Sequence, residues 1–225
     1  MRAGRLIVLE GPEGAGKTTQ LGLLASRLKL EGHSVLTLRE PGGTTLGDAI
    51  RGILLDPAQQ ITPAAEALLF MASRAEIVRR EIDPALDAGV MVLMDRFFLS
   101  TYAYQIAGRG LNETQIREAN AIATGGRIPD LTVVIDVPAE HGMARATARG
   151  SQDRMESSGD AFHARVSAAF STFATAEWQR GHSECGRIVK VDGTGSADAV
   201  EKKIAGVLAQ NLPHEFATLA EAHSG

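Results

Sequence analysis

The chain of 225 residues has little cysteine and few aromatic side chains: it contains one cysteine, one tryptophan and two tyrosines. Cys185 has no second cysteine for an internal disulfide, which is typical of a cytoplasmic protein. No apolar run approaches the roughly 20 residues of a membrane span. The six histidines are scattered without metal-ligand spacing. A strand pattern begins almost at the N-terminus, so we expect no signal peptide.

What the sequence does contain is a series of five β-rich runs separated by helical patterns. The runs cover Leu6–Glu10, Ser34–Arg39, Val90–Asp95, Leu131–Val137 and Arg187–Asp192. Helices are expected over Lys17–Leu30, Pro63–Leu86, Glu113–Thr124, Glu140–Arg149, Ala161–Arg180 and Ala197–Asn211. This alternation predicts an α/β fold, a five-stranded parallel sheet with helices on both faces. We expect one domain over residues 1–212 and a loose, polar tail over 213–225. A net charge of −4 argues against a nucleic-acid partner.

A phosphate-binding loop follows the first strand. The residues Gly11, Pro12, Glu13, Gly14, Ala15, Gly16, Lys17, Thr18 and Thr19 contain the pattern G-x-x-x-x-G-K-[ST] between a strand and a helix. Glycine lets the backbone N–H groups turn toward phosphate oxygens, and the helix adds its positive end. Lys17 is expected to neutralise the β- and γ-phosphates of ATP, and Thr18 to bind Mg²⁺. The motif predicts a P-loop NTPase fold and leaves the acceptor of the phosphoryl group open.

Asp95 ends the third strand and Arg96 follows it, so both are expected at the ligand crevice of the sheet. A carboxylate there can organise Mg²⁺ and its waters, and the planar guanidinium suits a phosphate. Taken alone, Asp95 could equally be a helix cap.

Five segments, in order along the chain, resemble the signatures of the bacterial thymidylate kinase family. They are 9–19 (LEGPEGAGKTT), 39–44 (REPGGT), 70–76 (FMASRAE), 95–105 (DRFFLSTYAYQ) and 149–156 (RGSQDRME). The resemblance extends from about Arg5 to about Asn211, with Ile106 standing where relatives commonly carry a smaller residue. It implies phosphorylation of dTMP to dTDP with ATP and Mg²⁺, and a homodimer packed through helices.

The same resemblance implies roles in the acceptor site. Phe70 is expected to stack on the thymine ring, with Arg74 on the same helical face reading a thymine carbonyl. Arg96 would clamp the acceptor phosphate, and Tyr104 would close the space that a ribose 2′-hydroxyl needs. Further implied contacts to this nucleotide come from Glu13, Glu40, Ser100, Thr101 and Gln105. Without the resemblance, Phe70 fits ordinary core packing and Arg74 a solvated helix face.

Basic residues around a Gly-Ser break indicate a lid over about 145–160. Phosphoryl transfer accumulates negative charge that must be kept from water, and a mobile arginine segment meets both needs. Gly14 stands where one subtype of the family carries a P-loop arginine, so the resemblance implies the lid-arginine subtype. Arg149 would then cover adenine and Arg154 would reach the transferring phosphate. The alternative for this cluster, which includes Arg145, is a solvated basic helix end.

The predicted catalytic residues are therefore Lys17, Asp95, Arg96 and Arg154, and the predicted metal ligands are Thr18 and Asp95. Two other functions stay open at this point. Another small-molecule kinase, of the deoxynucleoside or shikimate type, would share the P-loop and the lid but would not need Phe70, Arg74 and Tyr104. A non-catalytic nucleotide-binding module would need a switch segment with a hydrolytic glutamine, and no candidate is visible.

Overall fold

The computed structural model describes residues 4–147 and 153–216. Five parallel strands form one sheet in the order β2-β3-β1-β4-β5. The strands are β1 (Arg5–Glu10), β2 (Val35–Arg39), β3 (Met91–Asp95), β4 (Leu131–Asp136) and β5 (Ile188–Asp192). Each strand lies within one residue of its predicted bounds, so the predicted parallel α/β sheet is confirmed.

Several helices have the predicted bounds. They are α1 (Lys17–Leu30), α6 (Glu113–Thr124) and α10 (Ala197–Asn211), and α7 (Ala139–Thr147) begins one residue before its prediction. The predicted helix from Pro63 is continuous but changes pitch: α3 (Pro63–Ile77) leads into a π-helical turn, η1 (Val78–Ile82), and then α4 (Asp83–Asp87). Pro84 has no N–H to donate four residues back, and the π-helical turn ends just before it.

The predicted helix Ala161–Arg180 is wrong at its centre. It is divided into α8 (Asp160–Phe173) and α9 (Ala176–Gly181), because Thr175 starts a new helix by accepting a hydrogen bond from the N–H of Trp178. Four further elements had not been predicted: α2 (Thr45–Leu55), α5 (Phe98–Thr101), a π-helix η2 (Tyr102–Gly108) and a 3₁₀ turn η3 (Ser183–Cys185).

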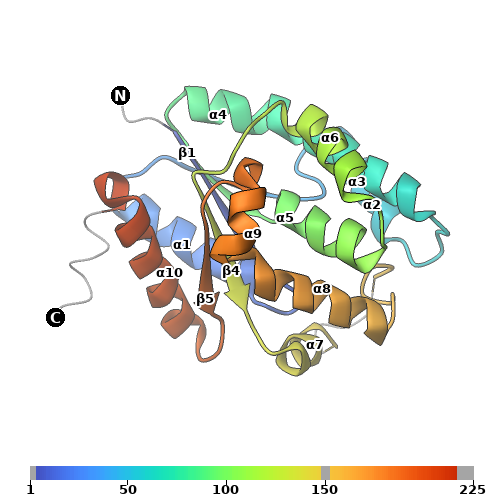
Figure 1. Ribbon diagram of the computed structural model, residues 1–225. Helices are drawn as coiled ribbons and strands as arrows, with labels where there is room; N and C mark the ends of the chain where they lie inside the picture. The colour runs from blue at the N-terminus through green and yellow to red at the C-terminus, as the bar shows by residue number, and fades with distance from the viewer. Residues whose placement is uncertain (1–3, 148–152, 217–225) are drawn as a thin grey trace.

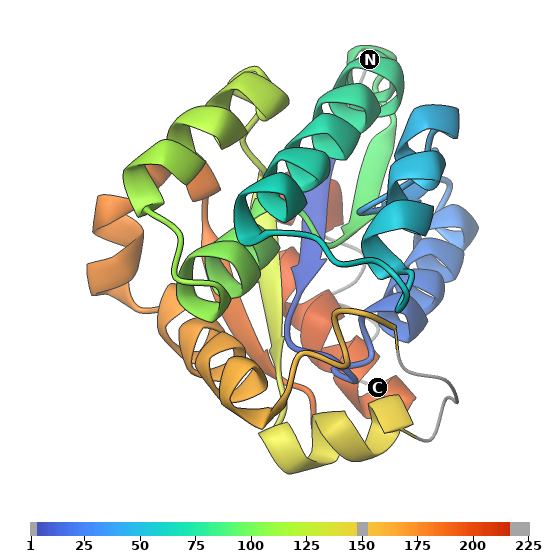
Figure 2. The same cartoon turned by 90° about the vertical axis from the view of Figure 1, so that its right-hand side faces the viewer.

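Helices cover both faces of the sheet (Figures 1 and 2), and the buried apolar side chains form one cluster on each face. Ile7 and Leu9 of β1 belong to the layer under α1 and α10, whereas Leu6 and Val8 face the layer of η1, η2 and α8. This period-2 alternation buries the central strand on both sides. Because β1 and β3 are parallel neighbours, their carboxyl ends lie together at one end of the sheet, where the P-loop follows β1.

The packed domain reaches beyond the predicted boundary at residue 212. A helical turn follows over 213–216, and Phe216 is fully buried in the layer with α1 and α10. Arg5 bonds to Glu215 and, at 2.7 Å, to Asp130. The remainder of the predicted tail, 217–225, lies outside the described residues. Among the helices that the structure describes, none has the length and apolarity that a membrane span requires.

Candidate active site

The P-loop connects the carboxyl end of the central strand β1 to α1. Gly14 has a φ of 69°, a left-handed conformation that favours glycine. A Cβ on Gly14 would lie 1.9 Å from the carbonyl oxygen of Gly142 in α7. The close approach of the two backbones therefore leaves no room for a P-loop arginine in this chain.

Lys17 is buried at the start of α1 with its ammonium folded over the loop. Its Nζ donates to the carbonyl oxygens of Gly11 (3.0 Å) and Pro12 (2.8 Å). Burial and the neighbouring charge of Arg96 lower the pKa of Lys17 to about 8. Two neutral carbonyls are weak partners for a buried cation, so phosphate oxygens in this loop would be strongly preferred.

The two predicted metal ligands are brought into contact. Thr18 Oγ1 donates to Asp95 Oδ2 at 2.5 Å, from the first turn of α1 to the end of β3. Both are oxygen donors, the type that Mg²⁺ prefers. Among residues 4–147 and 153–216 there is no group of three His, Cys, Asp or Glu that could hold an ion alone. The pair therefore fits an ion that takes its other ligands from ATP and water, as Mg²⁺ does in kinases.

Arg96 adopts a strained backbone conformation, and Glu10 fixes the residues that follow it. Its φ of 71° is the only positive φ of a non-glycine residue in the described ranges. The buried carboxylate of Glu10 accepts hydrogen bonds from the N–H groups of Phe97 (2.8 Å) and Ser100 (3.0 Å) and from the Ser100 hydroxyl (2.7 Å). Glu10 thus holds the turn that directs Arg96 into the pocket, a role that the sequence analysis did not predict.

The head group of Arg96 meets the acidic residue of the P-loop. Arg96 Nη2 donates to Glu13 Oε1 at 2.5 Å and Nη1 donates to Ser100 Oγ at 3.1 Å. The hydroxyl of Tyr104 donates to the same Glu13 oxygen at 3.0 Å, and the guanidinium lies 5.1 Å from the centre of the Tyr104 ring. Four predicted acceptor-site residues, Arg96, Glu13, Ser100 and Tyr104, therefore form one interacting group.

Arg74 is almost fully buried, and all five of its N–H donors have protein acceptors. Nε and Nη2 bond to Glu40, with a closest distance of 2.5 Å, and Nη2 also bonds to the carbonyl of Phe97. Nη1 donates to Thr101 Oγ1 (2.8 Å) and Asn120 Oδ1 (2.7 Å). A thymine carbonyl would have to share one of these donors. The structure thus shows Arg74 as the centre of a network that shapes the pocket wall, and its contact with the base stays a prediction.

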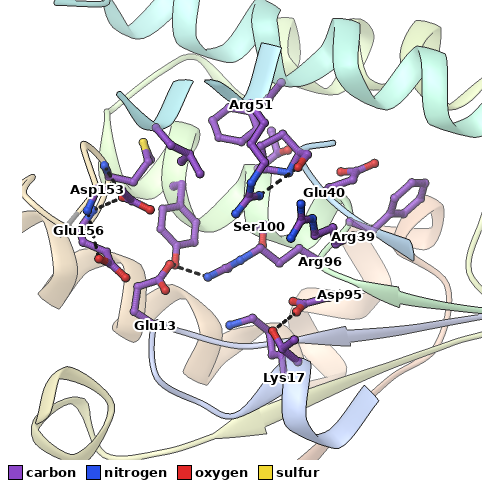
Figure 3. A pocket seen from close by; sticks show the side chains of 18 of the residues that line it. Glu13, Lys17, Arg39, Glu40, Arg51, Asp95, Arg96, Ser100, Asp153 and Glu156 are labelled. Carbon is purple, nitrogen blue, oxygen red and sulfur yellow. Dashed lines mark hydrogen bonds and ion pairs between the residues drawn. The ribbon is translucent and has the colours of Figure 1, made fainter. Parts of the chain in front are cut away.

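A cavity of about 290 Å³ joins the P-loop to these residues. Its lining includes most of the predicted site: Glu13, Gly14, Gly16, Lys17, Thr18, Thr19, Glu40, Phe70, Arg74, Asp95, Arg96, Ser100, Thr101, Tyr104 and Gln105. Gly11, Pro12 and Ala15 are buried in the loop beneath it. Lining residues absent from the predicted set include Arg39, Arg51, Asp153, Met155 and Glu156. Figure 3 shows Arg39, Arg51 and Arg96 on one side of the pocket, above Lys17 and Asp95.

Neither of the two described lid arginines, Arg145 and Arg154, lines this cavity. Arg154 does not line it: its guanidinium pairs with Glu66 (2.8 Å) and its Nε donates to the carbonyl of Leu54 (2.7 Å). Arg149 lies outside the described residues, and Arg145 is exposed on α7. The direct contact of Arg154 with the transferring phosphate therefore stays a prediction.

The family model described as Thymidylate kinase matches residues 9–204. A thymidylate kinase of Deinococcus radiodurans is 47% identical over 204 residues, which cover 91% of this chain and 96% of that protein. A thymidylate kinase of Thermomicrobium roseum is 52% identical over 175 residues, 77% of this chain and 83% of its own length.

The fold comparison agrees. The crystal structure of thymidylate kinase from Ehrlichia chaffeensis matches with a TM-score of 0.72 and 29% identity, and covers 92% of this chain and 99% of that one. Residues 9–204, which the family model matches, contain the P-loop, the Asp95–Arg96 turn and every described residue that lines the cavity. On this evidence the chain belongs to the thymidylate kinase family.

Proposed function

We propose that the chain phosphorylates dTMP to dTDP with ATP, as its family membership indicates. The observation that carries this is the joining of the P-loop and an arginine-lined cavity into one pocket, so that two phosphate groups can meet end to end. A coupled assay with ATP, Mg²⁺ and the common nucleoside monophosphates tests it. Turnover of dTMP well above that of the others is expected, and comparable turnover of a purine monophosphate would contradict it.

The acceptor phosphate requires no general base from the protein. The second pKa of a phosphate monoester is about 6, so the nucleophile is already an anion at neutral pH. What the protein must supply is alignment and compensation of charge. In this proposal Lys17 would face the donor phosphates, while Arg96, Arg39 and Arg51, which line the same cavity, would face the acceptor phosphate. We therefore propose Arg51, whose Nη1 donates to the carbonyl of Pro41 at 3.0 Å, as a further contact to the acceptor phosphate.

Magnesium is the proposed cofactor. Thr18 and Asp95 would hold it beside the P-loop, where a divalent ion neutralises charge on the ATP phosphates. The hydrogen bond between the two side chains supports this, because it keeps both oxygens near one point before any ligand arrives. In this proposal Asp95 binds and orients the magnesium ion and takes no part in proton transfer.

A homodimer is the proposed assembly. Helices α2, α3 and α6 lie side by side (Figure 2), and they expose four large apolar side chains: Leu46, Ile53, Leu68 and Ile122. Ile122 is 83% exposed and Leu68 63%, and an apolar patch shared by neighbouring helices is typical of an interface. Sedimentation velocity should give a dimer for the native chain and a monomer for Leu68→Asp with Ile122→Asp. A native chain that sediments as a monomer at high concentration would rule the proposal out.

The cytoplasm is the proposed compartment, because the buried thiol of Cys185 is a free cysteine, as a reducing environment favours.

A further inference from the structure

Glu66 is a buried carboxylate one helical turn before Phe70, and its side chain is 1% exposed. Four donors surround it. Gln105 Nε2 (3.0 Å) and Arg109 Nε (3.1 Å) bond to Oε1, while Arg109 Nη2 (3.0 Å) and Arg154 Nη2 (2.8 Å) bond to Oε2. Burial alone would raise the pKa of this carboxyl, but the hydrogen bonds from the two arginines and Gln105 outweigh it and lower the pKa. Glu66 is therefore ionised at neutral pH.

Arg154 connects this carboxylate to a second helix. Its Nε donates to the carbonyl of Leu54 at 2.7 Å, and its own N–H donates to the carbonyl of Leu55 at 3.1 Å. These carbonyls belong to the last turn of α2, where the helix dipole favours a cation. Arg154 is thus tied through backbone and side chain to α2 and to Glu66 on α3.

The backbone around Arg154 forms a compact segment, the 153–158 turn. Asp153 Oδ1 accepts from the N–H groups of Met155 (2.8 Å) and Glu156 (2.9 Å). At the far end of the turn, Arg109 Nη2 donates to Ser158 Oγ at 3.0 Å. Asp153, Met155 and Glu156 line the pocket. The arginines that bond to Glu66 therefore also hold this wall of the pocket in place.

Gln105 gives Glu66 a second route to the pocket. Gln105 is buried and lines the cavity, and its amide nitrogen points at Glu66. The amide oxygen is consequently turned the other way, as an acceptor. An ionised carboxylate can only accept hydrogen bonds, so Glu66 requires the NH₂ end of the Gln105 amide to face it. A neutral, donating group at position 66 would remove that restriction.

We propose that Glu66 is a positioning residue of the acceptor site, which orients the Gln105 amide and, through Arg154 and Arg109, holds the 153–158 turn against the pocket. The inference rests on the proposed function, since it takes this pocket as the dTMP site. Arg154, which pairs with Glu66 and does not line the pocket in this structure, contributes to the acceptor site through the turn that it holds. Loss of the Glu66 charge should weaken the acceptor nucleotide and leave the P-loop intact.

The decisive variant is Glu66→Gln, which preserves size but places an amide NH₂ among donors. Its matched control is Asp83→Asn. Asp83 also bridges two arginines, Arg79 (2.9 Å) and Arg127 (2.7 Å), on the same long helical segment, but it does not line the pocket. Any general effect of breaking a two-arginine cluster appears in both variants, whereas an effect on the acceptor site appears only in the first.

Two measurements distinguish the outcomes. By titration calorimetry, Glu66→Gln should bind dTMP about 10- to 100-fold more weakly, because small misplacements of contact groups are costly, with unchanged ATP affinity. By hydrogen exchange, the amides of the 153–158 turn should exchange faster in Glu66→Gln than in the native chain or in Asp83→Asn. Native dTMP affinity together with native exchange in Glu66→Gln would overturn the proposal.

A second variant protects the test if Glu66→Gln does not fold. Arg154→Gln leaves Glu66 paired with Arg109 and Gln105 and should still release the 153–158 turn. Native exchange of the turn in Arg154→Gln would also overturn the proposal. Failure of the proposed function is recognised separately, by a native chain that does not bind dTMP, while the exchange measurement needs no substrate.

Discussion

The hydroxyl of Thr18 donates to the carboxylate of Asp95 at 2.5 Å, across 77 positions of the chain. One residue begins α1 and the other ends β3, so the contact joins the P-loop to the neighbouring strand. The strand register fixes it: Asp95 lies opposite Leu9, just before the P-loop begins. The oxygen pair is therefore organised by the fold before nucleotide or metal arrives, which reduces the reorganisation needed on binding.

Asp95→Asn should lower turnover on the order of 10²-fold, because it removes a preorganised charge while keeping the shape of the side chain. It should also raise the Mg²⁺ concentration that gives half-maximal rate, which a Mg²⁺ titration of the initial rate measures. Asp136→Asn is the control, since Asp136 also ends a strand, pairs with Lys190 at 3.1 Å and does not line the pocket. An unaltered Mg²⁺ response in Asp95→Asn would contradict the assignment.

Binding of ATP should take up a proton at alkaline pH. The pKa of Lys17 is lowered to about 8 in the ligand-free protein, so its amine is charged below that pH and neutral above it. Phosphate oxygens favour the charged form and raise this pKa. Calorimetry in buffers of different ionisation enthalpy should detect uptake at about pH 9, whereas Lys17 should contribute none at about pH 6, where only the phosphates of ATP titrate. Lys17→Met should abolish the uptake; if it persists, another group is responsible.

The predictable part of the molecule is the part whose signal is local. The β-rich runs and the P-loop motif each lie within a few consecutive residues, and the structure places them as predicted. The π-helical turn before Pro84 and the break at Thr175 were not anticipated, because a continuous apolar periodicity hides a local change of pitch or a new cap. Helix α2 was missed although Thr44 caps it, since Gly42 and Gly43 read as a turn and obscured its start.

The site was predictable in composition and less so in its contacts. Arg51 carries no motif, and it reaches the pocket only because α2 packs beside α3. The partners of Arg74 lie 34, 27 and 46 positions away, in Glu40, Thr101 and Asn120. Spacing along a helix cannot reveal such partners. The family resemblance picked out residues that line one cavity, whereas the hydrogen-bond network among them follows only from the three-dimensional fold.

Arg74→Leu should destabilise the fold by about 3–5 kcal/mol, because it leaves the carboxylate of Glu40 buried without its cation. The double variant Arg74→Leu with Glu40→Leu should recover most of this loss in urea unfolding, since neither charge then remains. Both variants should keep a raised KM for dTMP, because Thr101 and Asn120 lose their common donor. A double variant no more stable than the single one would show that the ion pair is not the source of the effect.

Tyr104→Leu should improve the use of the ribose nucleotide relative to dTMP. The buried Tyr104 ring is expected to fill the space that a 2′-hydroxyl needs, and burying that hydroxyl unpaired costs about 1–3 kcal/mol. Tyr104→Phe is the matched control: it keeps the ring, and hence the discrimination, while losing the hydrogen bond to Glu13. The ratio of kcat/KM for the two substrates measures the effect. The same ratio in Tyr104→Leu and the native enzyme would locate the discrimination elsewhere.

The last prediction separates the two lid arginines. Moving the guanidinium of Arg154 onto a phosphate would break its 2.8 Å pair with Glu66, a carboxylate with 1% of its side chain exposed, and would leave Glu66 to Arg109 and Gln105. Removing a cation from a buried carboxylate is costly. We therefore expect Arg154→Ala to weaken dTMP binding while the single-turnover rate at saturating substrates changes little. Arg154→Lys keeps the charge but cannot serve Glu66 and the Leu54 carbonyl together, so it should show the same weakening in milder form. Arg149→Ala, outside the described residues, should instead weaken ATP through loss of stacking on adenine. A large fall in the single-turnover rate of Arg154→Ala with native dTMP affinity would show that Arg154 leaves Glu66 and reaches the transferring phosphate.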